Sequence, residues 1–322
     1  MMILVERKRH HLKIRERVHM RLSRRNVLRD MVLVILVWIA FCRATFGGEA
    51  SYPVEKRYCV WEVKGTKNTV FFLGSMHFMR KDMYPLPDSI NSLLERVRTV
   101  VFETDMVQAT SEEFRPWMER QMIYAGGKTL KEGIGKEMYD RLVQAAKPLG
   151  VDLSSWKNMK PWYVASALPH VKIEKMGYSS KLGLDVTLFG RVQQKQLSVE
   201  ALDGFKEHMQ VYSGMEESLQ KEFLEYSLDR LPLLKSSLPE LCAAWESGDI
   251  DTLVRLRKEG IGSYKGLYQR LFLDKNKRWL PRIELLIERE QDVLVVMGFG
   301  HLVGEGSVIQ MLRAKGFTVS QR

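Results

Sequence analysis

The chain has 322 residues, of which 45% are hydrophobic and 28% charged, and its formal net charge is +11. This is the balance of an ordinary globular protein, and it excludes a disordered or fibrous chain. The positive charge is concentrated at the N-terminus, where residues 1–30 hold ten Lys and Arg against three acidic residues. The rest of the chain is too weakly basic to form a nucleic-acid-binding surface, so we expect no nucleic-acid partner.

An uncharged apolar run, Met31–Cys42, follows this basic segment. The run is shorter than the roughly 20 residues that a membrane-spanning helix needs, and small residues follow it, so residues 1–50 are predicted to hold a secretory signal peptide. The segment Ser23–Arg29 resembles a twin-arginine export signal, although the apolar run suits the Sec route equally well. An uncleaved N-terminal anchor is the alternative. We therefore predict an exported protein, either periplasmic or anchored through its N-terminus to the outer face of the cytoplasmic membrane.

The first predicted elements form an α/β unit. Two β-rich runs, Cys59–Val63 and Thr69–Leu73, are separated by a turn-forming Gly-Thr-Lys-Asn segment and predict a β-hairpin. A Pro-Leu-Pro-Asp segment then introduces an amphipathic helix, for which Asp88 is the expected N-cap. The apolar run Thr99–Phe102, which ends at Glu103, predicts a buried parallel strand.

From about residue 107 to about residue 275 the pattern is almost entirely helical. The amphipathic stretches in this region lie at 114–125, 136–149, 160–176, 184–192, 216–229, 238–247 and 251–258. The segment 197–202 is the exception, because its composition favours a strand that returns to the sheet. This region is therefore predicted to be a large helical insertion.

The α/β pattern resumes near the C-terminus. It contains a helix at Arg278–Glu290, a buried strand at Asp292–Met297, a short helix near 307–315 and a final strand at 317–319. The predicted fold class is α/β, with a mixed sheet whose strands come from both ends of the chain and are separated by the helical insertion. The domain is expected to span residues 51–322.

Two histidines, His77 and His301, occur in the same setting, a Gly-x-x-His motif directly after an apolar strand. In open α/β sheets ligands bind at the carboxyl ends of the strands, and Glu103 ends a third predicted strand. Two imidazoles and a carboxylate are a common ligand set for a catalytic divalent metal ion. The pattern therefore predicts a metal site. The alternative interpretation is that each motif is an ordinary turn and that Glu103 only pairs with an arginine.

Taken together and in order, several motifs resemble the signature of the GumN family, the bacterial members of the wider TraB/TIKI group. These motifs are residues 60–63 (VWEV), 68–77 (NTVFFLGSMH), 84–87 (YPLP), 100–106 (VVFETDM), 181–185 (KLGLD), 276–279 (NKRW) and 296–304 (VMGFGHLVG). The resemblance covers essentially everything after the N-terminal segment and implies an EreA/ChaN/TIKI-like fold. Asp203 departs from the family pattern, which usually has Gly-Leu-Glu where this chain has Ala-Leu-Asp, so we leave it outside the predicted site.

In the related eukaryotic TIKI proteins the two motifs and an acidic residue are associated with metal-dependent proteolysis. The resemblance therefore implies that His77 and His301 are metal ligands and that Glu103 is a ligand or the general base. It also implies that Asn276 and Arg278 face the site. A metal-bound water would then attack an amide or ester carbonyl, and the Arg278 guanidinium would stabilise the developing oxyanion. The implied protein is a hydrolase that depends on a divalent ion such as Mn, Co or Zn and acts as a peptidase.

Two other functions stay open at this stage. One is a non-catalytic binder that sequesters a peptide or a haem-like ligand, and the other is an esterase acting on a small molecule. Asp185 is a weaker candidate for the site, because an Asp at a helix start is more often a cap. His170 and His208 lie in helical, polar segments and are interpreted as surface or packing residues.

Overall fold

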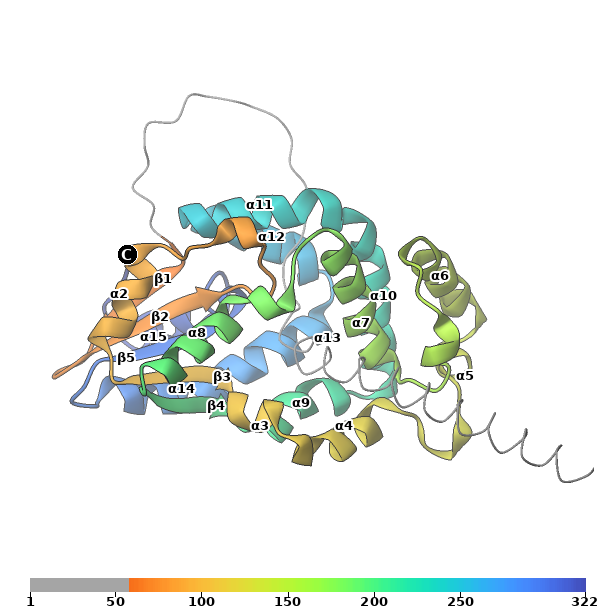
Figure 1. Cartoon of the computed structure of the whole chain (residues 1–322), viewed down its shortest axis with the longest axis horizontal. Helices are drawn as coiled ribbons and strands as arrows, with labels where there is room; N and C mark the ends of the chain where they lie inside the picture. Colours follow the sequence, from red (N-terminus) through yellow and green to blue (C-terminus); the bar gives the residue numbers. More distant parts are fainter. Residues whose placement is uncertain (1–57) are drawn as a thin grey trace, which may run out of the picture.

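The structure, a computed structural model, describes residues 58–322 (Figure 1). The predicted signal peptide or anchor within residues 1–50 lies outside the described residues. The described part is built on one six-stranded sheet with the order β4-β3-β5-β2-β1-β6. The strands are β1 (Val60–Lys64), β2 (Thr69–Ser75), β3 (Thr99–Thr104), β4 (Ser198–Asp203), β5 (Val293–Gly298) and β6 (Val319–Gln321).

The sheet is mixed, as predicted. Strands β4, β3, β5 and β2 run parallel to one another, whereas β1 pairs antiparallel with β2 and with β6. The hairpin, the buried strand before Glu103 and the strand within the insertion are all present. Every residue of β5 is buried, which suits a parallel strand covered on both faces. The α/β fold class with strands from both chain ends is therefore confirmed.

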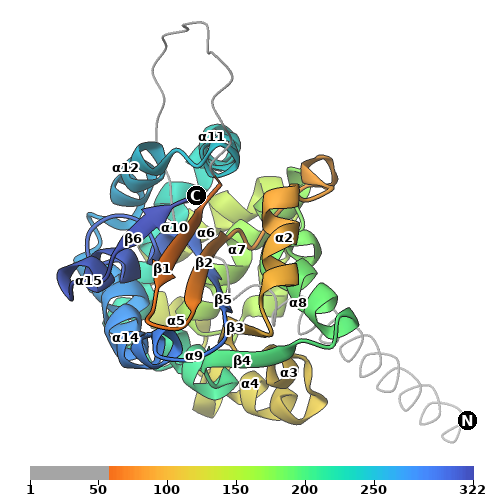
Figure 2. The same cartoon turned by 90° about the vertical axis from the view of Figure 1, so that its left-hand side faces the viewer.

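Helices cover both faces of this sheet. Figure 2 shows α2 and α8 on one side of the strands and α14 and α15 on the other, which is the usual way to bury a parallel sheet. The helices are α2 (Asp88–Arg96), α3 (Met106–Thr110), α4 (Arg115–Met122), α5 (Leu130–Ile134), α6 (Lys136–Ala146), α7 (Pro161–Lys175), α8 (Leu184–Gln194), α9 (Phe205–Ser213), α10 (Glu217–Arg230), α11 (Leu234–Ser247), α12 (Ile250–Ile261), α13 (Lys265–Tyr268), α14 (Asp274–Ile287) and α15 (Val308–Ala314).

The predicted start of α2 is wrong by one residue. Pro87 is the N-cap, and no side chain caps the helix. Asp88 lies in the first turn instead, where its negative charge interacts favourably with the positive end of the helix dipole.

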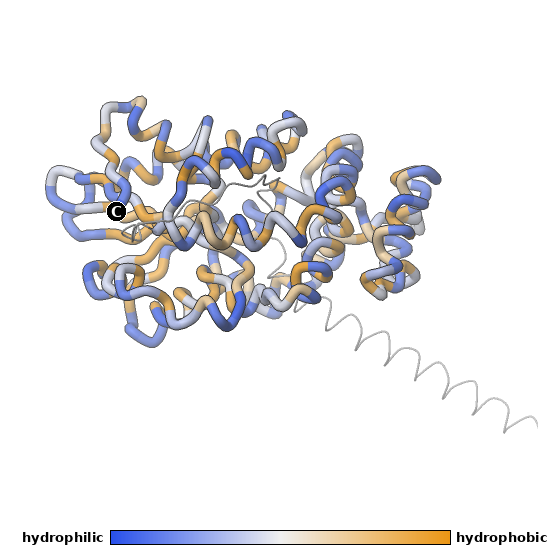
Figure 3. Tube along the Cα trace, turned by 90° about the horizontal axis from the view of Figure 1, so that it is seen from above, coloured by the Kyte–Doolittle hydropathy of each residue, from blue (hydrophilic) through white to orange (hydrophobic). Residues whose placement is uncertain are grey.

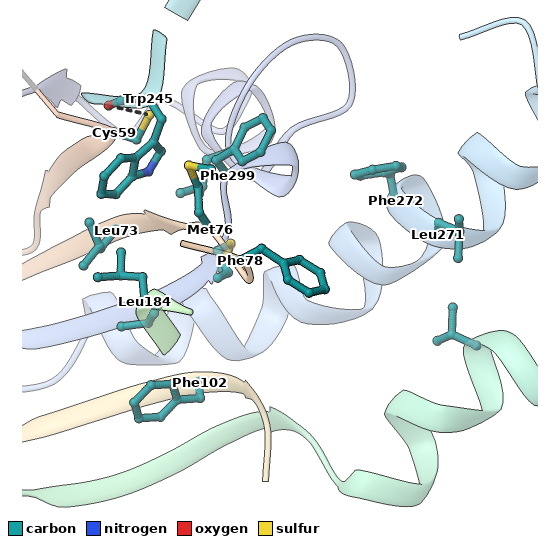
Figure 4. Close-up of a cluster of buried hydrophobic side chains, with 14 of the residues drawn as sticks. Cys59, Leu73, Met76, Phe78, Phe102, Leu184, Trp245, Leu271, Phe272 and Phe299 are labelled. Atoms are coloured by element: carbon teal, nitrogen blue, oxygen red, sulfur yellow. Dashed lines mark hydrogen bonds between the residues drawn. The ribbon is translucent and has the colours of Figure 1, made fainter. Parts of the chain in front are cut away.

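The helical insertion packs against the end of the sheet rather than forming a separate unit. Figure 4 shows that the buried cluster combines Phe102 of β3 with Trp245 of α11 and with Phe299, which follows β5. The Trp245 indole N–H donates a 2.7 Å hydrogen bond to the carbonyl of Gly74, so a buried backbone oxygen at the first Gly-x-x-His motif is satisfied from the insertion. Burying a large apolar side chain stabilises the fold by about 1.5–3 kcal/mol.

The hydrophobic residues of the helices are interspersed with hydrophilic ones along the chain (Figure 3). Within residues 58–322 no helix is both long enough and apolar enough to cross a membrane. Cys59 and Cys242 are both buried and both free, so they do not pair with each other.

Candidate active site

The two Gly-x-x-His motifs and Glu103 meet beside Gly298, the last residue of β5. A β-carbon at Gly298 would lie 3.2 Å from Glu103 Oε1, 3.2 Å from His77 Nε2 and 3.8 Å from His301 Cδ2. The three side chains therefore surround one small space, although they come from widely separated parts of the sequence. They meet because β2, β3 and β5 are adjacent and parallel, so their carboxyl ends lie at the same edge of the sheet.

Glu103 is buried and held from several directions. Its Oε1 accepts a 2.6 Å hydrogen bond from the Gly298 backbone N–H, and its Oε2 accepts a 3.0 Å bond from Lys275 Nζ. Burial acts to raise the pKa of Glu103, but the positive charge of Lys275 opposes it and, with the neighbouring imidazoles, brings the pKa well below its usual range. Glu103 is therefore ionised at neutral pH.

The His301 ring is oriented by Asn276. His301 Nδ1 lies 2.7 Å from Asn276 Oδ1, while Asn276 Nδ2 donates a 2.8 Å bond to the Gly306 carbonyl. With the amide oriented in this way, Nδ1 carries the proton and Nε2 keeps its lone pair, 3.7 Å from Glu103 Oε1. Burial lowers the pKa of His301 to about 3, so the ring is neutral.

The His77 ring is oriented by Asp185. His77 Nδ1 lies 3.3 Å from Asp185 Oδ1, which assigns the proton to Nδ1 and leaves Nε2 directed at the space beside Gly298. Asp185 is buried in the first turn of α8. Gly183 is needed next to it, because a β-carbon there would lie 2.5 Å from the His77 carbonyl oxygen. Asp185, a weak candidate in the sequence, thus contacts a predicted site residue directly.

Lys275 belongs to the site, although the sequence analysis did not select it. Lys275 and Asn276 are consecutive and both almost fully buried, at 2% and 0% exposure. The turn that precedes them, Gln269–Leu273, is a π-helix. The Lys275 ammonium also lies 4.4 Å from the centre of the Trp279 ring, a cation–π contact.

Arg278 pairs with two carboxylates outside this group, whereas the family resemblance implied that it would face the site. Its Nη2 lies 2.8 Å from Asp203 Oδ2 and its Nε 3.0 Å from Glu207 Oε1. Asp203 also accepts a 2.7 Å bond from the Trp279 indole. Arg278 and Asp203 therefore join α14 to the end of β4, and the guanidinium is committed to two carboxylates.

The remaining two histidines are not surface residues. His170 and His208 are 5% and 2% exposed, so only the packing part of their predicted role fits the structure. The His170 ring packs edge-on against Phe78, the residue after His77, with 4.9 Å between the ring centres.

The donor chemistry of the site fits a divalent metal ion. Both motif histidines keep an Nε2 lone pair at the space that Glu103 Oε1 also faces, and both Nδ1 atoms are fixed by an acceptor, as is usual for metal-binding histidines. Within residues 58–322, however, no group of three or more His, Cys, Asp or Glu side chains is arranged so that it could hold a metal ion. Lys275 meanwhile supplies the positive charge beside Glu103.

The fold and this edge of the sheet define an α/β protein with one buried polar site made from both ends of the domain. The chain belongs to the TraB/PrgY/gumN family, whose model matches residues 59–321. The chain is 24% identical over 246 residues to the uncharacterized protein YbaP of Escherichia coli (strain K12), which covers 75% of this chain and 86% of YbaP. No solved structure shows significant similarity to the chain.

Two further relatives are more distant. The chain is 21% identical over 346 residues to a metalloprotease TIKI homolog of Amphimedon queenslandica, across 90% of this chain and 66% of that protein. It is 20% identical over 302 residues to an uncharacterized protein of Treponema pallidum (strain Nichols), across 88% of this chain and 89% of that protein. The family and the metalloprotease TIKI homolog point to a hydrolase in general terms.

Proposed function

We propose that this protein is a divalent-metal-dependent hydrolase that cleaves peptides. The observation that carries the proposal is the meeting of His77 Nε2, His301 and Glu103 Oε1 beside Gly298, with both Nδ1 atoms held by acceptors. The name of the metalloprotease TIKI homolog agrees with this chemistry. His77 and His301 would hold the ion through Nε2, with Glu103 as a third ligand or as the general base.

The chain's own residues have distinct tasks in this proposal. When bound, a divalent ion would lower the pKa of a water molecule and polarise a carbonyl oxygen. Glu103 is ionised and can accept a proton at Oε1, while Lys275 holds Oε2 in place. Asp185 and Asn276 keep the two imidazole rings in the tautomer that directs Nε2 inward.

The metal is tested by thermal unfolding of the full chain with and without Mn²⁺, Co²⁺ or Zn²⁺, together with the metal content of the purified protein. An ion at 100 times its dissociation constant should add about 2.7 kcal/mol to the free energy of unfolding. His77→Ala and His301→Ala should lose this gain. Glu225→Ala is the control, because this residue is distant from the site in sequence and pairs with Arg141 on the surface. If no ion stabilises the parent protein, the metal-dependent function is wrong.

Measuring which substrates are cleaved distinguishes a peptidase from an esterase and from a non-catalytic binding protein. The metal-loaded protein should cleave members of a random peptide library, as read by mass spectrometry, and His301→Ala should not. Cleavage of p-nitrophenyl acetate without cleavage of any peptide would favour the esterase. Metal binding with neither activity would favour a binding protein.

Export is part of the same proposal and rests on the basic segment 1–30 and the apolar run that follows it. Residues 1–55 fused to a reporter should carry it across the cytoplasmic membrane. Loss of export when Arg24 and Arg25 are both changed to Lys would identify the twin-arginine route, and unchanged export the Sec route. A reporter that stays in the cytosol would contradict the proposed localisation.

A further inference from the structure

His208 is a buried imidazole without a hydrogen-bond partner. It lies in α9, the helix that follows β4 after the N-cap Gly204, and only 2% of the residue is exposed. Among the described residues, 58–322, neither ring nitrogen has a hydrogen-bond partner. Leaving such groups unpaired in the interior is costly, and each case calls for an explanation.

The surroundings of His208 connect it to the site. Helix α9 packs against β3, the strand that carries Glu103, and Figure 1 shows the helix beyond the right-hand ends of β3 and β4. Burial first, and then the charge of Lys275, lower the pKa of His208 well below its usual value, while Glu103 acts in the opposite direction. After burial, the Glu103 charge also raises the pKa of Tyr212, one turn further along α9. Thr104 of β3 and Asp203 of β4 are partners in the parallel pair, so α9, which begins at Phe205, starts at the edge of the sheet where Glu103 lies.

His170 provides the comparison within the same molecule. It is also buried, and neither of its ring nitrogens makes a hydrogen bond within residues 58–322. Burial alone lowers its pKa to about 4, so the charges of Glu103 and Lys275 do not act on it. The two histidines share burial and a lack of hydrogen bonds but differ in whether the charges of Glu103 and Lys275 act on them.

The proposed hydrolysis needs a donor for the substrate's carbonyl oxygen. Arg278 was expected to fill this role, but it is committed to Asp203 and Glu207. A neutral imidazole N–H can polarise a carbonyl without carrying a charge of its own. We propose that His208 is a third imidazole of the active site, which donates a hydrogen bond to the carbonyl oxygen of the substrate. This inference rests on the function proposed above.

The test follows the ring nitrogens of ¹⁵N-histidine-labelled full-length protein by NMR, with signals assigned from single-histidine variants. Zn²⁺ is added first, and then acetohydroxamate, a small compound that presents a carbonyl oxygen to bound zinc. Zn²⁺ should shift the signals of His77 and His301. Acetohydroxamate should then shift those of His208 and leave those of His170 unchanged.

The outcomes distinguish the inference from the function on which it rests. If Zn²⁺ shifts His77 and His301 but acetohydroxamate leaves His208 unchanged, the role of His208 is overturned and the metal site stands. If Zn²⁺ does not affect His77 and His301, the metal-dependent function is overturned and this inference falls with it. Both additions are made to the parent protein, and the variants serve only to assign its signals.

Variants give a second measure by calorimetric titration of acetohydroxamate into the zinc-loaded protein. His208→Leu should weaken binding about tenfold, the scale of one lost hydrogen bond, whereas His208→Gln, which keeps an N–H donor, should stay within about threefold of the parent. His170→Leu is the matched control and should leave the affinity unchanged. Equal losses in His208→Leu and His170→Leu would indicate a packing role and overturn the inference.

Discussion

The Gly298 backbone N–H donates a 2.6 Å hydrogen bond to Glu103 Oε1, although 195 positions separate the two residues. The bond joins the end of β5 to the end of β3, so the second Gly-x-x-His motif and the acidic residue are held in one arrangement by the backbone itself. The same glycine leaves the space into which His77 Nε2 points. Gly298 thus serves both as a donor to the carboxylate and as the floor of the site.

Gly298→Ala should fill this space without unfolding the protein. The backbone angles at Gly298, φ −51° and ψ 131°, are accessible to alanine, but the new methyl would lie 3.2 Å from both Glu103 Oε1 and His77 Nε2. We expect a stability loss of about 1–3 kcal/mol from overpacking and a loss of Zn²⁺ binding of at least tenfold. Calorimetric titration with Zn²⁺ checks this.

The control is Gly190→Ala in α8, where a β-carbon would meet no atom within 4 Å. That change should raise the stability by about 0.5–1 kcal/mol, since alanine favours a helix more than glycine does, and should leave metal binding unchanged. Normal Zn²⁺ affinity in Gly298→Ala would show that the space beside Gly298 is not where the ion binds.

The Lys275–Glu103 pair predicts a non-additive double-mutant cycle. Both side chains are at most 7% exposed and lie 3.0 Å apart, so Glu103→Gln leaves a buried ammonium without its carboxylate. We expect Glu103→Gln and Lys275→Met each to lose about 3–5 kcal/mol of stability. The double variant should recover most of this loss. Urea denaturation of the four proteins measures the coupling.

Metal binding should behave differently in the same four proteins. Glu103→Gln and the double variant should both lose the stabilisation by Zn²⁺, because neither has the carboxylate. Lys275→Met should gain more from Zn²⁺ than the parent does, since a divalent ion then neutralises the buried Glu103. Zn²⁺ stabilisation that is equal in the double variant and the parent would exclude Glu103 as a ligand.

The sequence was sufficient to predict that His77, Glu103 and His301 would meet. Each follows or ends an apolar run, and parallel strands in one sheet bring their carboxyl ends to one edge, so a local pattern implied a long-range contact. The helical insertion was equally visible, because its amphipathic stretches have a clear period of 3.6 residues. These features depend on hydrophobic patterning, which the sequence states directly.

The side chains that surround His77, Glu103 and His301 could not be predicted from the hydrophobic pattern. Lys275 is a charged residue buried against Glu103, a long-range pairing that no apolar period reveals. Arg278 was assigned to the site by resemblance, although its carboxylate partners lie at the end of β4 and the start of α9. His208 lies in a segment of mixed polarity, so its burial depends on α9 packing against β3, a tertiary contact. Polar side chains reach their partners through geometry that hydrophobic periodicity does not encode.

Asn276 should control the metal affinity of His301 without being a ligand. Asn276 Oδ1 accepts a 2.7 Å hydrogen bond from His301 Nδ1, so Asn276→Leu removes the group that fixes the ring. We expect a loss of Zn²⁺ affinity of about 10–100-fold, the usual scale for such a partner. Asn276→Asp keeps an acceptor but loses the donor to Gly306, so it should retain most of the affinity at some cost in stability. Equal affinity losses in the two variants would contradict the orienting role.

Arg278→Lys should have little effect on the site. The guanidinium is 38% exposed and pairs with Asp203 and Glu207, so lysine keeps the charge and one contact. We expect a stability change within about 1 kcal/mol and an unchanged Zn²⁺ affinity. This prediction replaces the one made from the family resemblance, in which Arg278 faced the reaction. A tenfold drop in peptide cleavage with normal stability would restore that earlier role.

The stability of the protein should fall as the pH drops from neutral to about 4, partly because of His170. Burial lowers the pKa of this ring from 6.5 to about 4, and it outweighs Glu174, whose carboxylate lies 3.3 Å from Nε2 but is 41% exposed. The unfolded chain therefore takes up a proton near pH 6.5, whereas the folded protein does so only near pH 4. The free energy of unfolding therefore decreases between about pH 6.5 and pH 4, by up to about 3 kcal/mol for a pKa shift of this size.

His170→Leu removes this proton uptake while leaving Glu103, His208 and His301 in place. The loss of stability between pH 7.5 and pH 4.5, measured by urea denaturation, should therefore be smaller in the variant than in the parent by about 2 kcal/mol. The comparison uses the difference between two pH values within each protein, so any change in packing that leucine causes cancels. Parallel stability curves for the two proteins would mean that the pKa of His170 in the fold stays close to its unfolded value, because the Glu174 carboxylate offsets the effect of burial.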